Sequence, residues 1–129
     1  MKVTIRKALG CYNLVRPRES SWSVSLSVEG VGGTSQGWPE DDEPDVDGLP
    51  PSEVVDLLEG REARLLLNSS RERDRAFFAS VRERAESIDA AWAAQEAERM
   101  EREAQRLIQQ AALLSRRADG LRATYQVAQ

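Results

Sequence analysis

The chain has 129 residues, a length typical of one domain, of which 40% are apolar, 31% charged and only 5% aromatic. It contains no histidine, which excludes imidazole acid–base catalysis, serine–histidine and cysteine–histidine dyads, and imidazole metal ligands. Arginine supplies 16 of the 18 basic residues against 22 acidic ones, and the net charge of −4 gives no overall attraction for nucleic acid or membranes. The single cysteine, Cys11, excludes an internal disulfide and a thiolate zinc cluster and favours a reducing compartment.

Alternating apolar and polar residues predict β-structure in residues 1–32. Val3 and Ile5 alternate with polar neighbours, and residues 22–28 read Trp-Ser-Val-Ser-Leu-Ser-Val, a period of two that indicates half-buried strands. Pro17 before this run and the glycines after it favour turns on both sides. We therefore predict a small antiparallel sheet or hairpin, which must pack on helices because so few strands are not stable alone.

The composition of residues 33–50 is typical of a loop. This segment contains six carboxylates, no basic residue and several glycines and prolines, and we expect the basic residues of the β region to attract it. Trp38 is its one aromatic residue and is expected to anchor it to the core. The run 43–48 resembles the start of a calcium loop, but Val54 stands where such a loop needs a glutamate. We therefore predict an acidic loop without a metal.

From residue 51 onward the composition becomes that of α-helices. Pro51 suits the first turn of a helix and Gly60 its end, with apolar residues at helical spacing between them. The apolar run 65–67 either extends this helix or forms a short buried strand, and we favour the helix. Ser69 and Glu72 have the spacing of a capping box, which predicts the start of a new helix.

This new helix is predicted to be long. No glycine or proline interrupts the chain between Gly60 and Gly120, where strong helix formers dominate, so we predict one helix of roughly fifty residues. A polar stretch, 94–103, separates two apolar stripes, and the step from Trp92 to Ala104 breaks the heptad phase. The helix either continues through this stretch and changes partners there, or turns there into a helical hairpin. The lack of helix breakers favours a continuous helix.

Each apolar stripe has the alternating spacing of three and four residues found in coiled coils. The first runs from Phe78 to Trp92 and the second from Ala104 to Tyr125. The small β region cannot cover both, so a second copy of the chain is the simplest cover and we predict a homodimer or higher oligomer. The predicted interface residues are Val81, Ile88, Trp92, Leu107, Leu114 and Leu121.

Three arginines and one phenylalanine share a predicted helix face. Spacings of four, three and four residues separate Arg71, Arg75, Phe78 and Arg82. Guanidinium groups bind phosphate or carboxylate through paired hydrogen bonds, and a ring can stack on a base. This face therefore predicts a site for a nucleotide or another anionic aromatic ligand. The alternative is a solvated face, with the arginines paired to neighbouring acids and Phe78 in the core.

These features together predict an α+β fold in a single domain. Its parts are a β region at 1–32, an acidic loop at 33–50 and a helical region at 51–129 with a coiled-coil-like interface. We predict no catalytic residue, no cofactor and no metal, and hence a protein that is not an enzyme. No window approaches the roughly eighteen apolar residues of a membrane span, and we expect the protein in the cytoplasm, or in the host cytoplasm if a phage encodes it.

The predicted function is that of a non-catalytic, homo-oligomeric binding or inhibitory module with an anionic partner. That partner is a nucleotide-like ligand or an acidic protein surface. Modules of this build are common among accessory proteins of bacteria and phages, including inhibitors of host defences and proteins that sequester nucleotides, an analogy of architecture alone. The first alternative is a structural protein whose coiled coil scaffolds a larger complex. Nucleic-acid binding comes third, because the chain is acidic.

Overall fold

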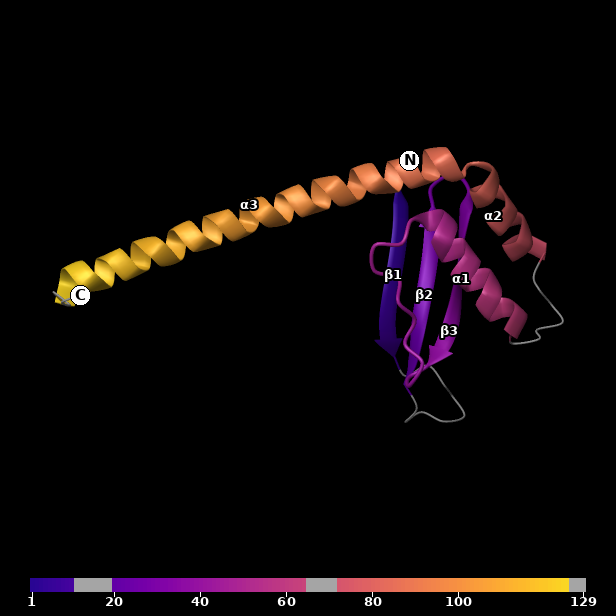
Figure 1. Ribbon diagram of the computed structural model, residues 1–129, viewed down its shortest axis with the longest axis horizontal. Helices are drawn as coiled ribbons and strands as arrows, with labels where there is room; N and C mark the ends of the chain where they lie inside the picture. Colours follow the sequence, from indigo (N-terminus) through magenta and orange to yellow (C-terminus); the bar gives the residue numbers. More distant parts are fainter. Residues whose placement is uncertain (11–19, 65–71, 126–129) are drawn as a thin grey trace. The chain divides into compact units, whose positions relative to one another are not determined.

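The computed structural model describes residues 1–10, 20–64 and 72–125, with no side-chain description at 63 and 64. A three-stranded antiparallel sheet comes first and three helices follow, which confirms the predicted α+β class (Figure 1). The elements in chain order are β1 (Val3–Gly10), β2 (Ser21–Val28), β3 (Gly32–Pro39), α1 (Pro51–Arg64), α2 (Glu72–Glu83) and α3 (Ala85–Tyr125).

The chain divides into two compact units. The first, Met1–Ala93, contains the sheet, α1, α2 and the first residues of α3. The second, Ala94–Gln129, contains the rest of α3.

The sheet is a simple meander with strand order β1-β2-β3. Both pairs are antiparallel, with Val3 opposite Val28 in the first and Val28 opposite Gly32 in the second. The period of two predicted for β2 is confirmed, because Val24, Leu26 and Val28 are buried while the serines between them are not. The apolar face is covered by α1 and α2, which contact β3, and α1 also contacts β2.

The third strand lies where the composition predicted the beginning of a loop. β3 pairs with β2 along its whole length, and Gly30 and Gly32 turn the chain between them with positive φ angles of 80° and 137°. Its side chains are mostly small and polar, so it has no apolar alternation from which a strand could be predicted. Backbone hydrogen bonds to β2 hold it instead. Trp38 is only 7% exposed, which confirms its predicted place in the core.

The acidic loop after β3 lies against the N-terminal strand, as the opposite charges of the two segments predicted. The Lys7 ammonium donates to Glu43 Oε1 at 2.8 Å and to the Pro44 carbonyl at 3.1 Å. It also lies 5.1 Å from the centre of the Trp22 ring, whose Nε1 donates to the Glu40 carbonyl at 3.1 Å. The hydrogen bond to Glu43 raises the pKa of Lys7 above its ordinary value.

Helix α1 begins at Pro51 as predicted, but it does not end at Gly60. The helix continues to Arg64. Gly60 is an exposed residue inside it, with nothing within 4 Å of the position that a Cβ would take. Glycine there lowers the helix propensity but does not end the helix. Its first turn is held by Asp89 of α3, which accepts hydrogen bonds from the Ser52 amide at 3.0 Å and the Ser52 hydroxyl at 2.6 Å.

The single long helix predicted from residue 69 is in fact two helices. Helix α2 ends at Glu83 and α3 begins at Ala85, with a turn at Arg84 whose carbonyl accepts a hydrogen bond from the Ser87 hydroxyl at 3.1 Å. Residues on both sides of the turn, Val81 and Ile88, are fully buried in one core. Packing both helices on the same core thus overrides the uninterrupted helix propensity.

Beyond this turn the prediction of continuity is confirmed. Helix α3 passes through 94–103 without a break and ends at Tyr125, so no hairpin forms there. The apolar run 65–67 and the first three residues of the capping-box sequence 69–72 lie outside the described residues.

The hydrophobic core lies entirely in the first unit. In the described part of the chain the buried apolar residues are Val3, Val24, Leu26, Val28, Trp38, Val46, Val54, Val55, Leu58, Phe77, Phe78, Val81 and Ile88.

Candidate functional site

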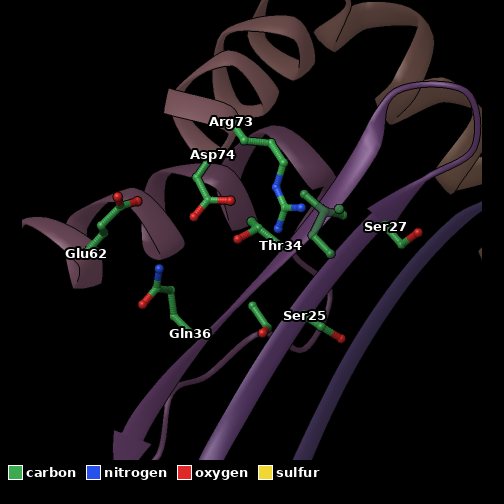
Figure 2. A pocket seen from close by; sticks show the side chains of 10 residues that line it. Ser25, Ser27, Thr34, Gln36, Glu62, Arg73 and Asp74 are labelled. Atoms are coloured by element: carbon green, nitrogen blue, oxygen red, sulfur yellow. The ribbon is translucent and has the colours of Figure 1, made fainter. Parts of the chain in front are cut away.

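A polar cleft of about 600 Å³ opens between the sheet and helices α1 and α2 (Figure 2). It is lined by Ser25, Leu26, Ser27, Gly33, Thr34, Ser35, Gln36, Glu62, Arg73 and Asp74. Position 33 leaves little room for a side chain, because a Cβ there would lie 3.0 Å from the Leu26 carbonyl oxygen of the neighbouring strand.

The side chains of the cleft carry charges of both signs. In Figure 2 the Arg73 guanidinium extends from α2 toward β3, the strand of Thr34, while Gln36 points from the sheet toward the helices. Glu62 and Asp74 are 7% and 6% exposed, so both carboxylates are largely buried in the wall. One guanidinium, two carboxylates and several hydroxyls can bind a small polar group through hydrogen bonds.

The cleft contains neither histidine nor cysteine. Its serines have no histidine to activate them, since the chain has none. Among the described residues no three acidic or cysteine side chains form a group that could hold a metal ion.

The four residues of the predicted anion site have different surroundings. Arg71 lies outside the described residues, and Arg75 is exposed on α2. Phe78 has no exposed surface and belongs to the core. Arg82 donates to Glu59 Oε2 and Asp56 Oδ1 of α1, both at 2.8 Å. Ligand binding by these residues stays a prediction, with the Phe78 ring covered and Arg82 joined to α1.

The surroundings of Arg82 stabilise its charged form. Hydrogen bonds to Glu59 and then to Asp56 raise its pKa well above the ordinary arginine value. The guanidinium is therefore fixed in its charged form and held against α1. Its partners in these hydrogen bonds lie on α1 and are not the acidic residues near Arg82 in the sequence.

Arg73 is the cleft residue that sequence reasoning missed. It lies four residues before the buried Phe77 and next to the buried Asp74, so it borders the apolar side of α2. The predicted face with Arg71 and Arg75 runs along a different line of the helix, so Arg73 was not part of it. Only the fold brings Arg73 to a strand of serine, threonine and glutamine residues, since these lie more than thirty residues away in the chain.

The predicted interface residues separate into two groups. Val81 and Ile88 have no exposed surface and Trp92 packs against the core, so one copy of the chain already covers them. Leu107, Leu114 and Leu121 are 51%, 61% and 60% exposed.

The exposed leucines belong to a long solvated helix. From residue 97 to residue 125 every side chain of α3 is exposed except that of Ala118, which is half-buried. Arginine–glutamate pairs one turn apart support the helix, with Arg99 Nη2 2.8 Å from Glu96 Oε2 and a similar pair formed by Arg106 and Glu103. The Glu96 pKa is lowered by its hydrogen bond to Arg99. This segment is a candidate interaction surface rather than a pocket.

Comparison with protein families, characterised proteins and solved structures finds no match. No helix in the described part of the chain combines the length and the apolar character needed to cross a membrane. The features of the described chain that bear on its function are therefore the polar cleft and the exposed half of α3.

Proposed function

We propose that the protein is a non-catalytic, self-associating binding module whose long helix pairs with a second copy of the chain. One observation supports this most: the heptad-spaced leucines of α3 are exposed, although the buried apolar residues of the described chain all lie in the first unit. The exposed stripe lies outside that core, which supports a separate partner for it.

The energetics favour such a partner. Full burial of one leucine side chain contributes roughly 1.5–3 kcal/mol. Because Leu107, Leu114 and Leu121 are already partly covered, at 51%, 61% and 60% exposed, the six leucines of two copies contribute on the order of 5–10 kcal/mol, within the range of the association cost of about 4–15 kcal/mol. Heptad spacing is the pattern by which two helices bury such residues against each other.

Self-association is tested by measuring molar mass with light scattering during size-exclusion chromatography. The chain should elute at twice its mass of 14.4 kDa or more. Leu114→Glu should produce a folded monomer, because a carboxylate at the centre of the stripe cannot be buried without a partner. The matched control, Gln109→Glu, adds the same carboxylate on the opposite face and should leave the oligomer intact. A monomeric wild-type chain would overturn the proposal.

A second candidate function is the binding of an anionic ligand by the arginines of α2. It is supported by the exposure of Arg73 and Arg75 and by the hydroxyl-rich cleft that Arg73 borders. Inorganic phosphate and a panel of nucleotides should then raise the melting temperature, and Arg73→Glu or Arg75→Glu should abolish the rise. If no nucleotide or phosphate shifts the melting temperature of the wild-type chain, this candidate fails. Mass spectrometry of material purified from native cells separates it from a purely scaffolding role, in which only proteins would accompany the chain.

A further inference from the structure

Small and large residues alternate along the exposed stripe of α3. Alanine occupies every seventh position from 97 to 118, and a large apolar residue follows each alanine three positions later. All of these side chains except Ala118 are exposed. The stripe thus begins at Ala97 in one unbroken heptad phase, seven residues before its predicted start. Its members are Ala97, Met100, Ala104, Leu107, Ala111, Leu114, Ala118 and Leu121, and the large residue Tyr125 at the next position ends the alternation.

This alternation restricts how two such helices can pack. In a parallel pair alanine would face alanine and leucine would face leucine, so the interaxial distance would have to change at every layer. In an antiparallel pair each alanine faces a large residue, and every layer then has the same volume. Close packing at one interaxial distance therefore favours the antiparallel pair.

The charges beside the stripe change sign along the helix. The flanking positions of the first half carry glutamate, at Glu96, Glu101 and Glu103, and those of the second half carry arginine, at Arg117 and Arg122. A parallel pair in register would place glutamates beside glutamates and arginines beside arginines. Like charges at these positions disfavour pairing, whereas opposite charges select partner and orientation.

We infer that a second copy binds the exposed half of α3 in antiparallel orientation, with Ala104 facing the second copy's Leu114. This inference rests on the proposed self-association and adds its orientation and register. The same register places Ala111 opposite the second copy's Leu107. It also brings Glu103 beside the second copy's Arg117, and Glu101 beside Arg122, with each pair formed twice.

The ion pairs within one helix do not compete strongly with this arrangement. Glu103 pairs with Arg106, and Arg122 Nη1 lies 3.1 Å from Asp119 Oδ1, but all four side chains are half exposed or more. Exposed pairs of this kind contribute little stability. Each carboxylate can also accept from a second guanidinium.

The first experiment measures by sedimentation equilibrium whether a charge reversal raises or lowers the dimer dissociation constant. Arg117→Glu should raise the constant about tenfold, because two attractive pairs become repulsive. The matched control Arg116→Glu makes the same charge change on the outer face and should alter it less than about twofold. In a parallel pair Arg117→Glu would instead lower the constant by placing glutamate beside arginine. A lower constant overturns the antiparallel inference but leaves self-association standing.

The second experiment measures distance by pulsed electron paramagnetic resonance on nitroxide-labelled cysteines in a Cys11→Ser background. Gln109→Cys lies at the centre of the proposed register and on the outer face of each helix, so its two labels should be separated only by the width of the helix pair, about 2–3 nm. Ala123→Cys lies fourteen residues further on, so its labels should be separated by at least 28 residues of helix, about 42 Å along the axis. Close labels at position 123 would show a parallel pair, and distant labels at 109 would show a different register; either result overturns the inference. A wild-type monomer in the sedimentation experiment overturns the proposed function as well.

Discussion

Phe78 shows how far residue-scale reasoning from the sequence reaches. Its spacing from Arg75 and Arg82 fits a ligand face and its spacing from Val81 fits a core stripe, because both lines run along the same helix. The structure places Phe78 in the core with no exposed surface and joins Arg82 to the carboxylates of α1. Sequence distance within α2 could not predict this, since Asp56 and Glu59 are more than twenty residues away.

At the same scale, the glycine at position 60 lowers the stability of helix α1. It lies inside α1, exposed, with open space where a Cβ would be. Gly60→Ala should therefore raise the free energy of unfolding by about 0.5–1 kcal/mol, because alanine loses less backbone entropy in a helix. Urea denaturation followed by tryptophan fluorescence measures the change. No increase would show that the helix does not persist through this residue in solution.

At the scale of elements, the sequence predicted those parts that local pattern determines. The apolar alternation of β2, the start of α1 at Pro51 and the continuity of α3 through 94–103 are all confirmed. The strand β3 and the turn at Arg84 were missed. The strand β3 depends on backbone pairing with β2, and the turn at Arg84 depends on packing Val81 and Ile88 into one core. Neither therefore produces a local pattern in the sequence.

Asp89 provides a test of how the helices are joined. Its carboxylate accepts two hydrogen bonds from Ser52 in the first turn of α1, so it caps that helix from α3. Asp89→Ala should lower the free energy of unfolding by about 1–2 kcal/mol, as the loss of a helix cap does. Guanidinium denaturation measures this loss, and Asp119→Ala, at an exposed site of α3, is the control. Equal stability of the two variants would contradict the capping role.

At the scale of the whole molecule, the core and the proposed interface lie in different units. Every buried apolar residue of the described chain lies between Val3 and Ile88. A chain ending at Ala93 should therefore remain folded, with near-wild-type tryptophan fluorescence, and should be monomeric. Circular dichroism and light scattering test both properties. An unfolded fragment would show that the long helix is needed for the core itself.

The cleft and the long helix carry two different proposed functions, ligand binding and self-association. Arg73 is brought to the cleft only by the fold, whereas the whole stripe of α3, including Ala97 and Met100, follows from the seven-residue spacing in the sequence. Binding of a small ligand and self-association are therefore separable properties. Variants of Arg73 should leave the oligomer unchanged, and variants of Leu114 should leave the cleft unchanged.

The claim that the exposed half of α3 binds a second copy of the chain is tested by the molar mass of the intact protein in solution. Sedimentation equilibrium at micromolar concentration should give at least twice the chain mass of 14.4 kDa for the wild type, and the single-chain mass for Leu114→Glu. A wild-type chain that sediments as a folded monomer at all accessible concentrations would contradict the claim.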